Sequence, residues 1–234
     1  MALQDLQQAI PAGHRQMLVT EVTRMKNGMV CAAGIDVHSG AMIRPLQPGG
    51  VNWPQSDWVD KDFMRVGNVL DLAPAAPCPS DKPHATEDFI VATVTRMATA
   101  TPEQLFDACV DTADTAFSDI FGDLLIDDKY VEDRADCRSL GCLIVSSDDI
   151  TVSSNFDKVT LVYDDASGVR HYIKVTELTF AAQDEAAADA LRARIAGHDR
   201  VALRLGLARA WDGPDKDWSP RRCYLQLNGV IVPA

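Results

Sequence analysis

The sequence lacks the features that mark membrane-spanning and secreted proteins. Its longest nearly continuous apolar run, Met29 to Ile35, is too short to cross a lipid bilayer. The first residues, MALQDLQQAIPAG, contain neither a basic start nor an apolar segment of signal-peptide character. We therefore expect a cytoplasmic protein with no membrane partner.

Metal-binding and disulfide patterns are also missing. The 6 cysteines include no C-x-x-C pair, and none has the spacing of zinc-finger ligands. Cys31 and Cys223 lie within strand patterns, where a free thiol behaves as a small apolar side chain. Reduced thiols are typical of the cytoplasm. The sequence thus predicts no metal and no cofactor.

The motifs of several large enzyme classes are absent as well. The chain has no G-x-S-x-G, no G-x-x-x-x-G-K-[ST], and no G-x-G-x-x-G after a strand. Gly206 stands alone within a strand pattern, which indicates a close backbone approach rather than a phosphate-binding loop. The common hydrolase and nucleotide-dependent classes are therefore disfavoured.

A formal net charge of −12 opposes non-specific attraction to nucleic acid. Acidic residues are concentrated in 107–136 and 148–165, whereas basic residues occur in 192–209 and at Arg221-Arg222. Any nucleic-acid site would therefore have to be local. The alternative interpretation is an acidic linker and an ordinary mixed surface.

Short strands dominate the first half of the chain. Asn27-Gly28 between two apolar runs indicates a hairpin, because a type I′ turn needs positive φ at both central residues. Thr101, Pro102 and Gln104 form a helix start with a capping box. We predict strands over 17–25, 29–36, 41–45, 69–73 and 89–97, and a helix over 101–114.

Strand patterns return in the second half. Residues 158–163 and 169–176 flank a turn of Asp, Ala, Ser and Gly, which is typical of a hairpin. Asp184 to Ala196, followed by Gly197, has the pattern of a helix with a C-terminal glycine cap. The remaining predicted strands cover 140–146, 201–207 and 223–232.

These patterns predict a mainly β protein with a few helices (α+β), built from two small antiparallel barrels. An acidic stretch with mixed character separates them. The predicted organisation is a lead-in over 1–16, a first barrel plus helix over 17–115, an acidic linker over 116–138, and a second barrel with one inserted helix over 139–234.

Arg44 is the first candidate for ligand binding. It ends an apolar strand just before Pro45, where a guanidinium can face a pocket and bind a phosphate or carboxylate through two hydrogen bonds. The alternative pairs Arg44 with Asp36 across the hairpin as part of the architecture.

A second candidate is the proline-bounded segment that begins at Pro83. His84 lies close to two carboxylates there, Glu87 and Asp88, so it could serve as a catalytic base or a metal ligand. The segment lacks the second histidine of a zincin motif. The alternative is a loop capped by the carboxylates, with His84 hydrogen bonded.

The third candidate is the C-terminal strand pair and its intervening loop. Strand alternation places arginines, an aromatic ring and amides on the polar faces of these strands, an arrangement that can stack a base and read its edge. The alternative is a solvated sheet face, with Trp211 and Trp218 packing the loop. The candidate residues are Arg204, Arg209, Trp211, Arg222, Tyr224, Gln226 and Asn228.

Six segments give the sequence a resemblance to a bacterial family described as dual OB-containing proteins. They are GMVCAAGID, IRPLQPGG, PHATEDF, SLGCLIV, LRLGLARAW and CYLQLNGV. The resemblance implies two fused oligonucleotide/oligosaccharide-binding (OB) barrels and a recognition role in bacterial defence or nucleic-acid transactions, without established catalytic residues. The motif positions that it singles out are Asp36, Arg44, His84, Glu87, Asp88, Arg209, Gln226 and Asn228.

The leading functional hypothesis is a non-enzymatic module that binds single-stranded nucleic acid or a nucleotide-like anionic ligand. One alternative is a small hydrolase or lyase that uses His84 with Glu87 or Asp88, while Arg44 holds an anion. A second alternative is a subunit whose acidic face docks a basic protein partner.

Overall fold

The first half of the chain forms a closed β-barrel. In the computed structural model, which describes residues 2–155 and 158–234, strand β1 pairs with both β5 and β2 and so closes a sheet of order β1-β5-β6-β3-β2-β4. Strands β3 and β6 pair in parallel. The elements are α1 (Ala2–Leu6), β1 (Arg15–Arg24), η1 (Lys26–Gly28), β2 (Met29–Asp36), β3 (Met42–Leu46), β4 (Trp53–Pro54), α2 (Gln55–Trp58), β5 (Asn68–Pro77), η2 (His84–Thr86) and β6 (Asp88–Thr99).

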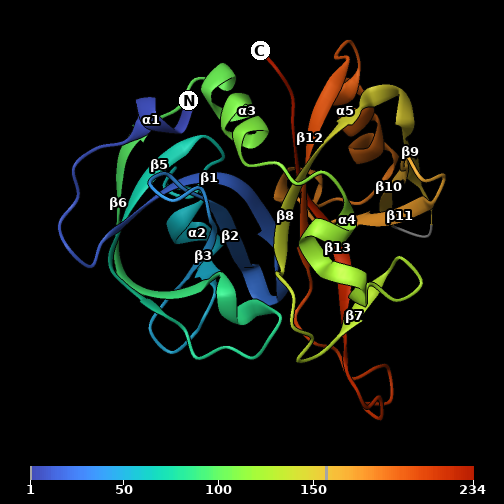
Figure 1. Cartoon of the computed structure of the whole chain (residues 1–234), viewed down its shortest axis with the longest axis horizontal. Coiled ribbons are helices and arrows are strands. Elements are labelled where there is room, and N and C mark those ends of the chain that lie inside the picture. The colour runs from blue at the N-terminus through green and yellow to red at the C-terminus, as the bar shows by residue number, and fades with distance from the viewer. Residues whose placement is uncertain (1, 156–157) are drawn as a thin grey trace.

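The second half forms a second curled sheet beside the first, with α3 above the junction between them (Figure 1). Its order is β8-β12-β13-β11-β10-β9, with β7 paired to β13. Because η4 joins β8 directly to β9, the two ends of this sheet are continuous in the chain. The elements are α3 (Pro102–Asp111), α4 (Phe117–Phe121), η3 (Gly122–Leu124), β7 (Tyr130–Glu132), β8 (Leu140–Ser146), η4 (Ser147–Asp149), β9 (Ile150–Ser154), β10 (Val159–Asp164), β11 (Arg170–Val175), η5 (Leu178–Phe180), α5 (Glu185–Ile195), β12 (Arg200–Leu207) and β13 (Arg222–Ile231).

Three clusters of buried apolar side chains fill the described part of the molecule. One fills the first barrel around Met17 and Trp53, and another fills the second barrel around Phe121 and Leu203. The third lies between the barrels and combines residues from both, with α3 packed against β8 and β12. Burial of this third cluster supplies the hydrophobic attraction that holds the barrels together.

Strand β1 serves two of these cores at once. Met17 and Val19 face the interior of the first barrel, whereas Leu18 faces the interface. A bulge between Val19 and Glu21 shifts the alternation by one residue, so that Val22 again faces the interior. The bulge thereby turns Glu21 toward the second barrel, where it meets Arg204.

A second bulge lies across the interface, in the pairing of β12 with β13. The register shifts between Arg204 and Leu205, which leaves Asn228 as the extra residue of β13. Gly206 makes room for Asn228, because a Cβ at this glycine would lie 2.1 Å from Asn228 Nδ2. The sequence predicts a close backbone approach at Gly206, whereas the atoms that approach it in the structure belong to the Asn228 side chain.

Local signals in the sequence correspond to the observed elements. Asn27 and Gly28 both have positive φ, at 60° and 68°. Thr101 and Gln104 form the expected capping box at the start of α3. Asp184 caps α5, and Gly197 follows that helix with a φ of 84°.

Residues 116–138 differ from the expected acidic linker. They contain α4 and β7, and β7 pairs with β13. Phe117, Ile120, Phe121 and Val131 are buried in the core of the second barrel. In α4 the apolar side chains face the core and Asp119 faces solvent, so a composition that looks like a linker belongs to the second barrel.

No helix in the described ranges is both long enough and apolar enough to cross a membrane.

Candidate functional site

Arg44 and Asp88 form a buried ion pair where the two barrels meet. They lie opposite each other in the parallel ladder of β3 and β6, which brings their side chains together. Arg44 Nε donates to Asp88 Oδ1 at 2.6 Å, and Nη2 donates to Ser139 Oγ at 2.9 Å. Because Ser139 directly precedes β8, Arg44 links the first barrel to the second. Arg44 therefore pairs with Asp88 and not with Asp36.

Asp36 lies instead at the end of the hairpin between β2 and β3. Its Oδ1 accepts hydrogen bonds from the backbone N–H groups of His38 and Ser39, both at 3.0 Å. Its Oδ2 accepts from Arg15 at 2.8 Å. Bonds of this kind stabilise a turn, so the contacts of Asp36 indicate a structural role in this hairpin.

His84 is buried beside Arg44. Arg44 Nη2 donates to His84 Nδ1 across 3.1 Å, and no described residue forms a hydrogen bond of normal geometry with Nε2. Burial, together with the charges of Arg44 and Arg209, lowers the pKa of His84 to about 3, although Asp88 acts in the opposite direction. The imidazole is therefore neutral at pH 7.

Glu87 is engaged with the second barrel. Its Oε1 accepts from the Ser139 backbone N–H at 2.9 Å, and Oε2 accepts from Ser139 Oγ at 3.0 Å. Burial raises the pKa of Glu87. A general acid or base works best with a pKa near the working pH, which His84 does not have. The geometry thus favours a structural role for His84 and Glu87 over acid–base catalysis.

Arg209 is the partly exposed member of this group of side chains. Its Nη1 lies 2.8 Å from Asp88 Oδ2, and its side chain is 39% exposed. Burial acts to raise the pKa of Asp88, but Arg44, Arg209 and Ser80 together lower it, so the carboxylate is ionised. We name Arg44, His84, Glu87, Asp88, Ser139 and Arg209 the junction network. Arg209 also lines a cavity of about 510 Å³ with Leu46, Gly49, Gly50, Cys78, Pro79, Ser80 and Ile90.

Arg204 and Asn228 form a separate buried cluster with Glu21. The Arg204 side chain is 0% exposed, and its Nε donates to Glu21 Oε2 at 2.9 Å. Asn228 Nδ2 donates to Glu21 Oε1 at 3.0 Å. Strand alternation placed Arg204 on the non-core face of β12, but the first barrel covers that face. The structure therefore separates both residues from any surface site.

The remaining candidates converge on an exposed cluster at the end of β13. Trp211 is 45% exposed, and its ring centroid lies 5.1 Å from that of Trp218 and 6.1 Å from that of Tyr224. The Arg222 guanidinium lies between two rings, 4.0 Å from the Trp218 centroid and 4.5 Å from the Tyr130 centroid. We name Tyr130, Trp211, Trp218, Arg222 and Tyr224 the aromatic patch.

Strand pairing explains why these rings meet. Strands β7 and β13 place Tyr130 opposite Tyr224, with centroids 5.5 Å apart. Arg222 and Tyr224 share the outer face of β13, where Gln226 is also partly exposed. A backbone bridge between Trp211 and Arg222 returns the preceding loop to the strand.

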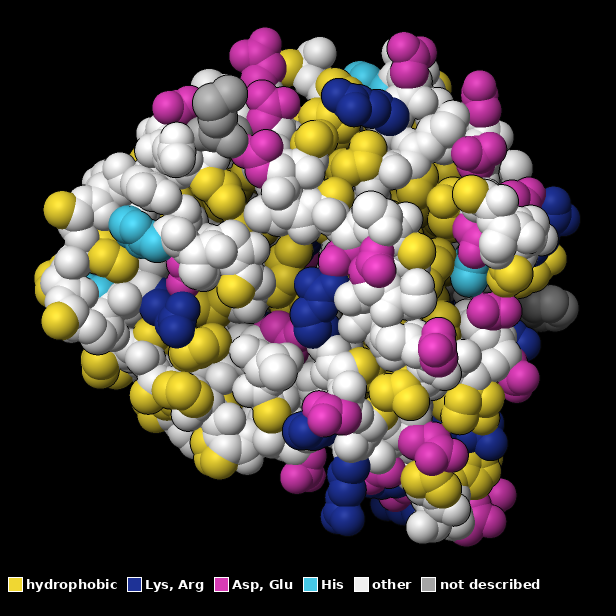
Figure 2. Space-filling model, viewed as in Figure 1, with side chains coloured by type: hydrophobic (Ala, Val, Ile, Leu, Met, Phe, Trp, Pro, Cys, Tyr) yellow, Lys and Arg dark blue, Asp and Glu magenta, His cyan; other side chains and the backbone are white. Residues whose placement is uncertain are grey.

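The loop between Trp211 and Trp218 also has a glycine that its geometry requires. Gly213 has a φ of +89°, and a Cβ there would lie 2.7 Å from the Trp218 ring. At the lower right of Figure 2, hydrophobic, basic and acidic side chains lie together over this loop.

Sequence reasoning missed several residues of the junction network, of the buried cluster around Glu21 and of the aromatic patch. Tyr130 lies in the segment that the sequence predicts to be a linker, and for Trp218 the sequence predicts only packing of the loop. Ser139 and Glu21 carried no sequence signal, because their roles depend on contacts between the two barrels. Within the described ranges, no group of three or more His, Cys, Asp or Glu side chains is arranged to hold a metal ion.

The fold defines a class of mainly β proteins built from two adjoining barrels, each with one parallel strand pair, β3 with β6 in the first and β11 with β13 in the second. The sequence matches the model of the dual OB-containing domain family over residues 15–230, and the chain belongs to this family. No curated protein matches the sequence.

Three solved structures show low similarity to the chain. A murine DNA-binding protein bound to double-stranded DNA is 10% identical, with 94% of this chain and 96% of that chain covered and a TM-score of 0.33. The tetrameric p202 HIN2 is 9% identical, with 96% of each chain covered and a TM-score of 0.32. A structure described as the molecular basis for abrogation of activation of pro-inflammatory cytokines is 10% identical, with 94% of this chain and 92% of that chain covered and a TM-score of 0.35.

Proposed function

We propose that this protein binds single-stranded nucleic acid through the aromatic patch, as a recognition module without catalytic activity. The observation that carries the proposal is the exposed Trp211 ring at the end of β13, which contacts Trp218 and Tyr224, with the Arg222 guanidinium over the Trp218 ring. Membership in a dual OB-containing family supports it. A role in bacterial defence and a cytoplasmic location extend the proposal; the six free cysteines support a reducing compartment.

Base stacking is the interaction that the patch offers. Aromatic rings stack with unpaired bases whatever their sequence, and each stacked base contributes about 1–3 kcal/mol. Bases that are already paired and stacked inside a duplex are not available for this contact. The patch therefore favours single strands over duplexes.

Phosphate contacts would come from arginines beside the rings. Arg209 lies two residues before Trp211 and is partly exposed, and Arg221 directly precedes Arg222. Both arginines are already paired, Arg209 with Asp88 and Arg221 with Asp133 at 3.0 Å. The paired aspartate partly neutralises each guanidinium, which weakens its attraction for phosphate. We therefore expect base stacking to contribute more to the affinity than phosphate contacts.

The test is the fluorescence anisotropy of labelled oligonucleotides at low salt. We expect oligo(dT) and a single-stranded RNA to bind more tightly than a duplex of equal length. Trp211→Ala should weaken binding by about fivefold or more, the loss of one stacking contact. Leu124→Ala removes another exposed apolar side chain, 42% exposed in the second half of the chain, and is the matched control.

A second variant separates charge from stacking. Arg222→Ala should weaken binding, whereas Arg65→Ala, which removes the same charge from a 71% exposed arginine on the first barrel, should not. The proposal fails if neither single strands nor nucleotides bind at low salt, or if the aromatic-patch variants and their controls behave alike. A copurifying basic protein released by moderate salt would then favour the protein-docking alternative.

A further inference from the structure

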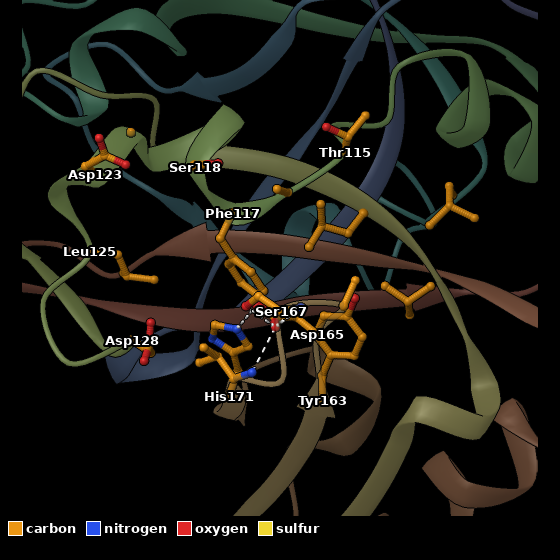
Figure 3. Close-up of a pocket in the computed structure, with 17 residues that line it drawn as sticks. Thr115, Phe117, Ser118, Asp123, Leu125, Asp128, Tyr163, Asp165, Ser167 and His171 are labelled. Carbon is orange, nitrogen blue, oxygen red and sulfur yellow. Dashed lines mark hydrogen bonds and ion pairs between the residues drawn. The ribbon is translucent and has the colours of Figure 1, made fainter.

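A separate cavity of about 570 Å³ opens on the second barrel (Figure 3). It lies between α4, the 122–128 loop, strand β8 and the hairpin of β10 and β11. Its volume suits a small ligand or a single side chain of a partner. Among the described lining residues there is no lysine or arginine.

Three rings form one wall of this cavity. Phe117 stacks on His171, with centroids 4.1 Å apart and an interplanar angle of 24°. Tyr163 lies 6.1 Å from His171 and 6.2 Å from Phe117, measured between centroids. Aromatic faces attract cations through their quadrupole, and a planar cation can also stack on them.

Three carboxylates line the same cavity. Asp123 and Asp128 come from the 122–128 loop, and Asp165 comes from the turn between β10 and β11. Neither Asp123 nor Asp128 makes a side-chain hydrogen bond or ion pair with a described residue. Burial acts to raise the pKa of Asp165, but hydrogen bonds from His171, Ser167 and Val169 lower it to about 2, so this carboxylate is ionised.

His171 also contributes a polar ring atom to the cavity wall. Its Nε2 lies 3.0 Å from Asp165 Oδ2, and its side chain is only 3% exposed. Because a carboxylate can only accept, Nε2 carries the hydrogen of this bond, and Nδ1 is the ring nitrogen that does not face Asp165. Nδ1 is buried and has no partner among the described residues. An unpaired buried polar atom is costly, so a ligand group that reached Nδ1 would gain a hydrogen bond.

We propose that this cavity binds a guanidinium group, carried either by a small guanidino compound or by an arginine side chain of a protein partner. A guanidinium is planar, permanently charged and presents five N–H donors, which matches stacked rings, free carboxylates and an unpaired imidazole nitrogen. An ammonium has the charge but not the plane. This site is independent of the aromatic patch and of nucleic-acid binding.

Isothermal titration calorimetry with arginine amide tests the proposal on the full chain. We expect arginine amide to bind, its neutral analogue citrulline amide not to bind, and lysine amide to bind more weakly. A short arginine-containing peptide distinguishes the two sources: tighter binding than arginine amide indicates a protein-borne arginine, and equal or weaker binding indicates a small compound.

Variants then locate the site. Asp123→Asn and Asp128→Asn should each weaken the binding of arginine amide by about twofold to fivefold, the range expected for a partly exposed ion pair. Asp107→Asn, at an exposed position of α3 outside the cavity, removes the same charge and should change nothing. The His171 ring resonances should shift on titration in an NMR spectrum.

Three results would overturn the proposal. One is an absence of binding by arginine amide and the peptide at millimolar concentration. Another is equal binding of citrulline amide or lysine amide. The third is an unchanged affinity in the variant that combines both substitutions, Asp123→Asn and Asp128→Asn.

Discussion

Replacing Glu21 with alanine is expected to lower the free energy of unfolding by about 4–6 kcal/mol. Glu21 is 1% exposed and is the carboxylate partner of Arg204, which is fully buried. Removing one partner of a buried ion pair costs about 3–5 kcal/mol, because the other charge stays buried without compensation. Asn228 Nδ2 also loses its acceptor, which adds about 1 kcal/mol.

Urea unfolding, followed by tryptophan fluorescence, measures this loss. Glu21→Gln keeps an oxygen that Asn228 can donate to but removes the charge, so it should fall between wild type and Glu21→Ala. Combining Glu21→Leu with Arg204→Met removes both charges and should recover stability to within about 2 kcal/mol of wild type, because apolar replacement of a whole buried pair is often tolerated.

The control is Glu103→Ala, an exposed acidic residue in the first turn of α3, which should cost less than about 1 kcal/mol. A loss below about 1 kcal/mol for Glu21→Ala would refute the reasoning, since it would mean that Arg204 reaches water or another partner. A double variant as unstable as Glu21→Ala would equally show that an unpaired buried charge is not the cause.

Four further outcomes are expected. Gly34→Ala should prevent closure of the first barrel, because the added Cβ would lie 1.9 Å from the Leu18 carbonyl oxygen; the far-ultraviolet circular dichroism melt checks it. His84 has a pKa of about 3 when folded and 6.5 as its ordinary value, so the unfolded chain takes up the proton first as the pH falls. As the pH falls between these values, the free energy of unfolding should therefore decrease by about 1.4 kcal/mol per pH unit. Urea unfolding at pH 7 and pH 5 should show that His84→Gln lacks this contribution to the pH dependence. Gly213→Ala should displace the Trp218 ring and weaken oligonucleotide binding in the anisotropy assay, without changing the melting temperature by more than a few degrees. With about three phosphate contacts on a single strand, affinity should fall roughly 15–20-fold between 50 and 200 mM salt, and a much steeper dependence would contradict a stacking-dominated site.

The elements of the fold that local chemistry specifies were predictable from the sequence. Asn27-Gly28 specifies a turn because both residues tolerate positive φ, and the Thr101 capping box specifies the first turn of α3. These signals act over a few residues, so no knowledge of the tertiary structure is needed to interpret them.

Contacts between the barrels were not predictable in the same way. Strand alternation separates Arg204 from the core-facing Leu203 and Leu205, and the structure agrees with that separation. Alternation cannot tell whether the other face meets water or a second barrel. The bulge in β1 that turns Glu21 toward Arg204 has no sequence signal of its own, because it depends on register.

For the candidate site, too, the residue types could be identified from the sequence, but their burial between the barrels could not. Arg44, His84, Glu87, Asp88 and Arg209 were chosen as ligand-binding or catalytic candidates because of their chemical types, and the structure brings all of them together. Four of the five are buried: Arg44 contacts Asp88 and His84, and Glu87 is hydrogen bonded to Ser139. Side-chain chemistry suitable for an anion is equally suitable for an internal carboxylate, and only the burial distinguishes the two.

The coverage of β13 explains why the aromatic patch remains as the exposed surface. Toward its C-terminal end, Asn228 and Ile231 are buried against the first barrel and cannot meet a ligand. Toward its N-terminal end, Arg222 and Tyr224 lie beyond that contact and are only partly buried. The loop that precedes this end begins at Arg209, which Asp88 of the first barrel fixes through an ion pair. The first barrel therefore both covers half of the strand and anchors the loop that brings Trp211 to the other half, so fusion of the two barrels itself positions the proposed stacking surface.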